Sequence, residues 1–236
     1  MNIKIIAVGS SKWERFIRKW GISFLIGKDV LFDTFGSPYV FLQNIKRYNI
    51  DLSKIRHIVI SHDDWDHISG LWCVIDRYKD LTVYICPNFK QDIKERIESF
   101  GAKVIEVDKP IKITDTIYAT GELRSESDSR TIYEQSLVIK TIKGLAVVTG
   151  CAHPGIIAIL DNINKYFNEQ IYLVAGGFHL KDKPDYEINQ IISVFKKRGV
   201  KKVTPIHCTG RLAIGLFRKE YGDNFIKIVP GSIIEV

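Results

Sequence analysis

The densest group of chemically active side chains lies in one short segment. Residues 61–67 read Ser-His-Asp-Asp-Trp-Asp-His, so five of the six residues after Ser61 are His or Asp. Carboxylates this close repel one another unless a positive charge lies among them. Imidazole suits zinc, iron and manganese, and carboxylate suits harder ions, so the segment predicts a divalent metal site. The alternative is a solvated acidic turn that caps the next helix, which leaves the two bracketing histidines unexplained.

Four apolar strands are predicted to end at or near a histidine. His62 follows residues 58–60, His153 follows 145–149, His179 follows 171–175 and His207 follows 203–206. Predicted helices separate the last three strands, which makes them parallel and brings their carboxyl ends to one edge of a sheet. Open sheets bind ligands beyond that edge. We therefore expect these histidines to converge on a common site, although any one of them alone is more simply a loop residue.

The elements that position this site follow from the apolar pattern. Strands are predicted at 2–8, 21–26, 30–33, 55–61, 82–86, 103–107, 137–142, 145–149, 171–175 and 203–206, and near Ile226 and Ile233. Helices are predicted at 38–48, 68–78, 88–100, 154–166, 185–197 and about 212–220. The polar residues 121–134 are expected to form an irregular surface loop, either over the site or inert. Residues 13–20 are compatible with an amphipathic flap, a dimer contact or an ordinary surface helix.

Composition limits the class of protein. The 236 residues are 45% hydrophobic and 26% charged, which excludes disorder, collagen and coiled coil for the whole chain. The net charge of +7 is compatible with an anionic partner such as a phosphorylated metabolite, nucleic acid or an acidic surface, although on charge alone a merely soluble basic protein is the simpler interpretation. A small anionic substrate is the expected partner. No apolar run is long enough to span a membrane, and no aromatic–basic alternation points to nucleic acid. Four cysteines without a CxxC pattern predict free thiols in a cytoplasmic protein, and a homo-oligomer is compatible with the sequence.

Residues 61–67 resemble the HxHxDH signature of the metallo-β-lactamase superfamily. Residues 31–34, Leu-Phe-Asp-Thr, are similar to the LFDTG of that family. Residues 149–155, 176–180 and 205–210 resemble the branch named for a dihydropterin–ribofuranosyl-aminobenzene phosphate synthase of methanopterin biosynthesis. The resemblance covers nearly the whole chain. It implies an α/β fold, a four-layer αββα sandwich with mixed sheets, formed by residues 1–236 as a single domain.

The resemblance also implies an activity. The expected protein is a metal-dependent hydrolase with two divalent ions (Zn, Fe or Mn) that acts on a small phosphorylated or ester substrate. The alternatives are a transferase of pterin biosynthesis and a metal-binding sensor without catalysis.

Roles carry over to the matching positions. One ion is expected at His62, Asp64 and His153, and the other at Asp66, His67 and His207. Asp66 is also expected to orient the attacking hydroxide. His179 is expected at the rim, as a proton donor or electrostatic contact to the substrate, with a ligand role as the alternative. Asp33 is expected to order a ligand histidine, and a plain turn residue is its alternative.

Two positions depart from the family pattern. Asp64 replaces the second histidine of the signature, which favours iron or manganese or leaves one metal position weak. Cys151 replaces the metal-bridging aspartate of many members, and a small buried residue is favoured over a ligand. For the substrate, we expect contacts from Arg211, Lys181 and Trp65, with Arg124, Arg130 and Lys183 as weaker candidates. Arg211 follows a turn at the start of a predicted helix, where a phosphate can bind.

Overall fold

The first β-sheet contains strands in the order β15-β1-β2-β3-β4-β5-β6. Their bounds are β1 (Asn2–Gly9), β2 (Gly21–Ile26), β3 (Val30–Phe32), β4 (His57–Val59), β5 (Thr82–Ile85), β6 (Lys103–Glu106) and β15 (Ile233–Glu235). Strands β15 to β3 pair antiparallel, and β3 to β6 run parallel. This computed structural model describes residues 1–11, 13, 16, 19–127 and 130–236.

The second β-sheet has the order β14-β13-β12-β11-β8-β7. Its strands are β7 (Ile111–Lys112), β8 (Ile117–Ala119), β11 (Leu137–Thr141), β12 (Gly144–Thr149), β13 (Ile171–Gly177) and β14 (Lys202–Ile206). Strands β11 and β12 form an antiparallel hairpin, and β12, β13 and β14 run parallel, as predicted from the intervening helices. Their carboxyl ends therefore share one edge.

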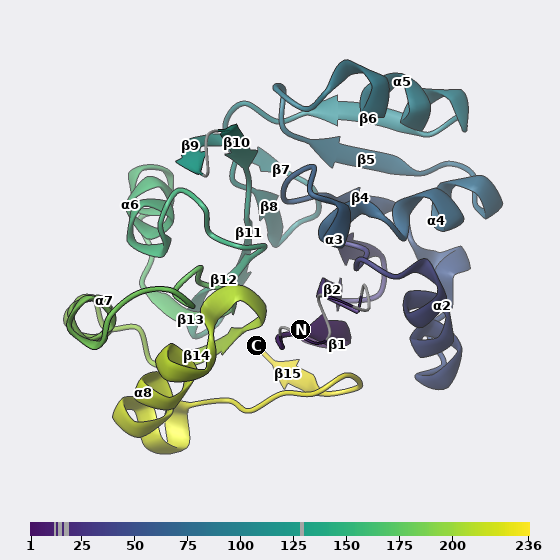
Figure 1. Ribbon diagram of the computed structural model, residues 1–236. Coiled ribbons are helices and arrows are strands. Elements are labelled where there is room, and N and C mark those ends of the chain that lie inside the picture. Colours follow the sequence, from purple (N-terminus) through teal and green to yellow (C-terminus); the bar gives the residue numbers. More distant parts are fainter. Residues whose placement is uncertain (12, 14–15, 17–18, 128–129) are drawn as a thin grey trace.

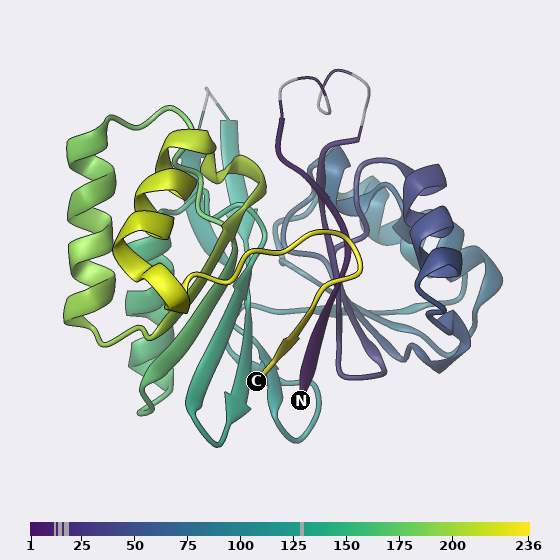
Figure 2. The ribbon, with the colours of Figure 1, turned by 90° about the horizontal axis from the view of Figure 1, so that it is seen from below.

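Helices cover the outer face of each sheet (Figure 1). On the first sheet lie α2 (Pro38–Arg47), α3 (Trp65–Ile68), α4 (Leu71–Arg77) and α5 (Gln91–Ser99). On the second lie α6 (Ile156–Tyr166), α7 (Asp185–Lys197) and α8 (Arg211–Tyr221). Figure 2 shows the two sheets face to face between these two helical layers. The prediction of a mixed α/β fold of the αββα type is confirmed.

The interior between the sheets explains why the strands read as continuous apolar runs. Phe24 and Phe32 of the first sheet share one buried cluster with Leu137 and Val148 of the second, and none of the four is exposed. One further buried cluster lies between the first sheet and its helices, and another lies between the second sheet and its helices. Each fully buried side chain of this size contributes about 1.5–3 kcal/mol, so the strand ends that carry the histidines are held by a rigid core.

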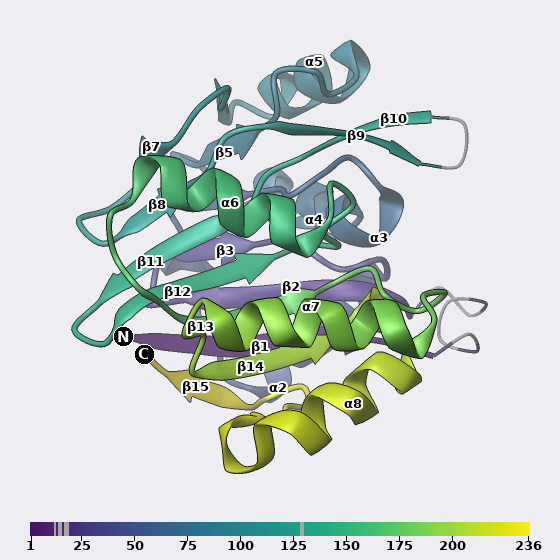
Figure 3. The same ribbon diagram turned by 90° about the vertical axis from the view of Figure 1, so that its left-hand side faces the viewer.

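Residues 121–134 are not the irregular loop that we expected. They form an antiparallel ribbon of β9 (Leu123–Ser127) and β10 (Arg130–Glu134). The prediction was wrong because it relied on the polar composition of the segment. The β-branched and aromatic residues Thr131, Ile132 and Tyr133 favour extended structure. Figure 3 shows the ribbon projecting beyond the sheets on the side where β12 ends. It therefore borders the site.

The predicted helix at 68–78 is in fact two helices. It begins earlier, at Trp65, and is interrupted between α3 and α4. A Cβ at Gly70 would lie 2.3 Å from the carbonyl oxygen of Thr34, so only glycine permits this close approach.

Other differences from the predicted elements are smaller. Helix α5 begins later than residue 88 and α6 begins after Gly155. Ile226 lies in no strand. The adjacent Phe225 makes one isolated bridge to Val203, which does not extend into a strand. The predicted flap at 13–20 falls largely outside the described residues. Across the residues that are described, no helix has the length and apolar character needed to cross a membrane.

Candidate metal centre

Asp33 organises the segment that carries His62 and His67. It lies directly after β3 with a φ of 54°, and it is fully buried. Its Oδ1 accepts from the Ser61 amide at 2.7 Å, and its Oδ2 accepts from the Ser61 hydroxyl at 2.8 Å. Oδ2 also lies 2.6 Å from Nδ1 of His67. An ionised carboxylate only accepts hydrogen bonds, so His67 must donate through Nδ1.

The same network fixes the tautomer of His62. Its Nδ1 lies 2.9 Å from the Ser61 hydroxyl, which already gives its hydrogen to Asp33. His62 must therefore donate through Nδ1, which leaves the lone pair on Nε2. The two imidazole rings lie 4.1 Å apart between centroids. Asp33 thus holds both rings of the 61–67 segment with Nε2 turned inward, as expected of a residue that orders a metal ligand.

Asp66 lies between two imidazoles from opposite halves of the fold. Its Oδ2 is 3.2 Å from Nε2 of His67 and 3.4 Å from Nε2 of His207. Nδ1 of His207 donates to the carbonyl of Gly9 at 2.8 Å, so this histidine also turns Nε2 inward. Burial raises the pKa of Asp66, but the neighbouring imidazoles outweigh burial and hold it far below its usual range. Asp66 is therefore an anion at any physiological pH.

Glu134 positions His153, and Glu134 was not among the residues predicted from the sequence. This buried carboxylate at the end of β10 accepts from the amides of Cys151 at 2.8 Å, Ala152 at 2.7 Å and His153 at 2.8 Å. It also lies 2.9 Å from Nδ1 of His153, which must donate to it. Burial raises the pKa of Glu134, but the bond to His153 and the nearby imidazoles outweigh burial and lower it well below its usual range.

The four histidines 62, 67, 153 and 207 thus have the same arrangement. Each gives its Nδ1 hydrogen to a fixed acceptor, and each keeps Nε2 for the interior of the site. Among the described residues, Nε2 of His62 and Nε2 of His207 are buried without any hydrogen-bond partner. An unpaired buried nitrogen costs about 1–3 kcal/mol, so their arrangement fits a cation better than an empty core.

The ligand atoms form overlapping sets. Atoms of His62, Cys151 and His153 lie within 4.8 Å of one another, and so do those of His67, Cys151 and His207. Each set contains two of the histidines expected at one ion position, but Cys151 stands in both sets where Asp64 and Asp66 were expected. The donor types fit a pair of divalent transition-metal ions.

Asp64 lies at the margin of these sets. Its Oδ2 is 3.6 Å from Nε2 of His62, but both oxygens also accept from Arg130, each at 2.7 Å. Burial raises the pKa of Asp64, but His62 and Arg130 outweigh burial and hold it far below its usual range. Arg130 begins β10, so the unexpected ribbon supplies the partner of Asp64. The structure places Asp64 beside the centre without joining it to a ligand set.

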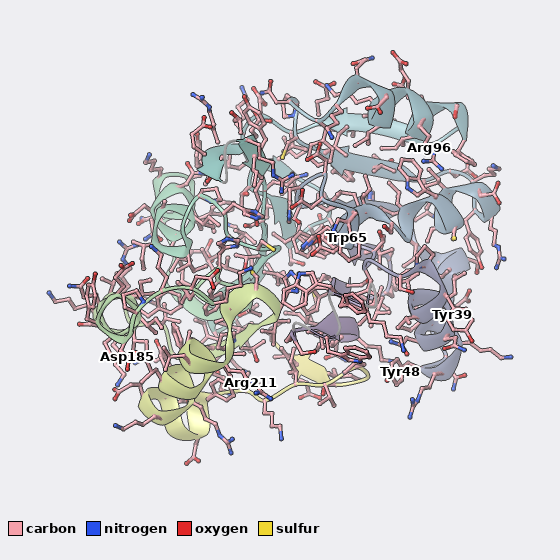
Figure 4. All side chains as sticks on the ribbon, viewed as in Figure 1. Tyr39, Tyr48, Trp65, Arg96, Asp185 and Arg211 are labelled. Carbon is pink, nitrogen blue, oxygen red and sulfur yellow. The ribbon has the colours of Figure 1, made fainter. Side chains whose placement is uncertain are left out.

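A pocket of about 280 Å³ opens onto the centre. Its lining includes Trp20, Trp65, Arg130, His179, Lys181 and Cys208. Trp65 and Lys181 therefore lie where a substrate contact was expected. Arg211 is exposed and is not among the lining residues, and Figure 4 shows it on the side of α8, apart from Trp65. Of the weaker candidates, Arg130 lines the pocket, while Arg124 pairs with Glu126 and Lys183 with Glu187.

Substitution of Asp33 by asparagine should weaken metal binding. The amide cannot accept at both positions, so His67 and His62 lose the acceptor that fixes their tautomers. Residues that orient metal ligands typically contribute about 10–100-fold in affinity. Competition with a chromophoric chelator measures this directly. Asp29→Asn, an acidic residue at the other end of β3, is the matched control, and equal affinities for the two variants would contradict the role of Asp33.

Comparisons with known proteins agree with this geometry. The chain is 31% identical, over 93% of its length and 91% of the relative's, to 7,8-dihydropterin-6-methyl-4-(beta-D-ribofuranosyl)-aminobenzene-5'-phosphate synthase of Methanocaldococcus jannaschii. It is 28% identical to an uncharacterized protein of the same organism, over 99% of this chain and all of that protein.

A solved structure is also similar. Tm1679, a metal-dependent hydrolase of the beta-lactamase superfamily, superimposes with a TM-score of 0.81 and 29% identity, covering 100% of this chain and 99% of that one. The sequence profile of the metallo-beta-lactamase superfamily matches residues 23–180. With its fold, its signature segment and its converging histidines, the chain belongs to the metallo-β-lactamase superfamily.

Proposed function

We propose that this protein is an enzyme with two divalent ions that acts on a small phosphorylated substrate. The observation that carries the proposal is the common orientation of four histidines from distant parts of the chain. His62, His67, His153 and His207 each donate outward through Nδ1 and direct Nε2 to one centre. A merely structural cluster has no need for four independent acceptors that impose the same tautomer.

His62 and His153 would hold one ion, with Asp64 beside them, and Asp66, His67 and His207 would hold the other. Two such ions supply a water of lowered pKa and a clamp for phosphoryl or carbonyl oxygens. Oδ2 of Asp66 lies 3.2 Å from Nε2 of His67 and 3.4 Å from Nε2 of His207, so its charge would help to hold the second ion and to orient the attacking oxygen. Trp20 and Trp65 line the pocket beside the centre.

The pocket supports an anionic substrate that carries a ring. Arg130 and Lys181 supply positive charge at the wall, and Trp20 and Trp65 supply flat apolar surface. The two terminal nitrogens of Arg130 already donate to Asp64, so Arg130 would contribute positive charge and Lys181 would be the more direct contact to a phosphate. Hydrolysis of a phosphoester is the first candidate reaction, because Tm1679, one of the similar solved structures, is described as a metal-dependent hydrolase.

A synthase reaction is the second candidate. A relative whose sequence matches 93% of this chain is named a 7,8-dihydropterin-6-methyl-4-(beta-D-ribofuranosyl)-aminobenzene-5'-phosphate synthase. A pocket with two tryptophans and two cationic side chains is compatible with one aromatic ring and one phosphate. In this candidate the same histidines would hold the ions, and the ions would supply positive charge to the phosphate of a substrate.

Metal analysis and activity screening test the proposal. Protein purified without chelator should hold about two divalent ions per chain, and His62→Ala should lower this number by at least one. Chromogenic phosphoesters and a pterin–aminobenzene pair are then assayed with Mn, Fe or Zn. His57→Ala is the matched control, because His57 lies outside the centre and contacts Tyr84. Fewer than about one ion per chain, with no effect of His62→Ala, would overturn the proposal.

Metal affinity should rise with pH. Burial lowers the pKa of His67, but the carboxylates of Asp66 and Asp33 outweigh burial and raise it well above the usual value. Protonated His67 therefore stabilises the metal-free fold. This stabilisation is fully present at pH values below the ordinary histidine pKa, and it is lost as the pH rises through the raised pKa of His67. An ion must displace that proton, so its affinity should increase about tenfold per pH unit up to the raised pKa. Chelator competition over the neutral range gives the slope, and a flat profile would contradict the prediction.

A further inference from the structure

Two cysteines lie against the proposed metal centre on the side of the pocket. Cys151 follows β12, and Cys208 lies in the short 3-10 turn His207–Thr209 after β14. Their side chains are almost fully buried, with 5% and 3% exposure. His179, which follows β13 between them, completes a set in which all ligand atoms lie within 4.8 Å of one another. Three neighbouring parallel strands thus deliver two sulfurs and one imidazole to one point.

The backbone is adapted to this approach. A Cβ at Gly177, near the end of β13, would lie 2.6 Å from Sγ of Cys208 and 3.1 Å from Cα of Cys151. Only glycine lets the two cysteines meet across the central strand. His179 has a φ of 53°, which is costly for a residue with a Cβ and persists only where the surroundings demand it.

One ring nitrogen of His179 lacks an acceptor, although the imidazole also interacts with the thiol of Cys208. Its Nδ1 is buried without a hydrogen-bond partner in the described part of the chain, unlike Nδ1 of the four histidines of the centre. An alternative account treats both thiols as small apolar residues packed beside Trp20 and Trp65. That account leaves Nδ1 of His179 without a partner. The thiols have only weak contacts, since Sγ of Cys208 donates to the carbonyl of Cys151 at 3.3 Å and Sγ of Cys151 lies 3.4 Å from Nε2 of His67. A soft cation would bind both sulfurs and the imidazole more strongly than these contacts do.

We infer that Cys151, His179 and Cys208 form a further metal site for a thiophilic divalent ion such as Zn²⁺, adjoining the histidine centre through the sulfur of Cys151. Two thiolates and one imidazole are a known zinc set that leaves a fourth position open. All three residues line the pocket, so the site is next to the space where a substrate would bind. The inference goes beyond the proposed function, and it makes His179 and Cys151 ligands instead of a proton donor and a buried neighbour.

Cobalt substitution of the full-length protein tests this site without an activity assay. The wild-type chain titrated with Co²⁺ should show thiolate-to-cobalt charge-transfer absorption. Cys208→Ser should reduce that absorption at least about twofold and lower the bound cobalt by about one per chain. Cys73→Ser is the matched control, because Cys73 is a partly exposed thiol of α4 outside the set, and it should change neither quantity. Absence of the absorption, or its full retention in Cys208→Ser, would overturn the inference.

A second measurement uses only the wild-type chain, in case a cysteine variant fails to fold. Zn²⁺ should slow the alkylation of Cys151 and Cys208 by iodoacetamide at least about tenfold more than that of Cys86, a buried cysteine outside the set. Equal protection of all buried cysteines would show a general stabilisation and overturn the site. Two ions bound without a sulfur signal would refute this inference and leave the proposed function intact, whereas no bound ion would refute both.

Discussion

Replacement of Asp66 by asparagine should lower turnover about a thousandfold. Asp66 is the only carboxylate of the described chain whose oxygen lies within 3.4 Å of Nε2 on two histidines of the centre. The amide has nearly the same shape but no charge, so the ion held by His67 and His207 loses its anionic ligand. The electrostatic contribution of such an ion amounts to several kcal/mol in the transition state, and each 1.36 kcal/mol is about tenfold in rate.

The measurement combines metal content with steady-state kinetics. Asp66→Asn should retain the ion beside His62 and His153 and lose the other, so the content should fall by about one ion per chain. Asp63→Asn makes the same change of charge three residues earlier, outside the ligand sets, and should keep its metal and most of its activity. Full metal content and normal turnover in Asp66→Asn would remove the basis for a role of Asp66 in the reaction.

Glu134→Ala should destabilise the protein by about 3–5 kcal/mol. The substitution leaves three buried amides and Nδ1 of His153 without their acceptor. Each orphaned buried donor costs about 1–3 kcal/mol, and partial relaxation of the loop reduces the sum. The ring of His153 also loses its fixed tautomer, so metal affinity should fall about 10–100-fold.

Urea unfolding in the presence of chelator separates the two effects. Glu126→Ala, on the facing strand β9, removes an exposed carboxylate and should cost less than about 1 kcal/mol. Because the pKa of Glu134 is lowered, its ionised carboxylate stabilises the fold at pH values above the ordinary carboxyl pKa. This stabilisation is lost as the pH falls through the lowered pKa. Acidification should therefore destabilise the wild type more than Glu134→Ala. Similar losses for Glu126→Ala and Glu134→Ala would contradict the role of Glu134.

Local patterns in the sequence were enough to predict that the histidines at the strand ends lie close together. Each strand before a histidine is an apolar run, and the helices between the last three strands impose a parallel order that brings their ends together. The role of Asp33 was predicted because residues 31–34 resemble a motif of the superfamily. The convergence of the histidines needed only strand–helix alternation and residue type, which the sequence displays directly.

Residues that support the ligands could not be found in this way. Glu134 bonds to amides 17 to 19 positions further along the chain, and nothing in its neighbourhood distinguishes it from other acidic residues. Arg130 meets Asp64 across 66 positions, through a ribbon whose polar residues resemble a loop. Cys208 meets Cys151 only because β14 and β12 flank β13 in the sheet.

The sequence by itself determined which histidines meet at the sheet edge, because the alternation of strands and helices along the chain brings the carboxyl ends of parallel strands together. The resemblance of its motifs to the superfamily indicated the αββα fold. Tertiary structure alone decided which atoms face the centre, because hydrogen-bond acceptors from remote segments select the tautomer of each histidine. It also decided that Lys181 and not Arg211 reaches the pocket. Gly210 packs so closely on Lys181 that a Cβ there would lie 2.4 Å from the lysine Cα, and the helix that follows leaves Arg211 exposed to solvent.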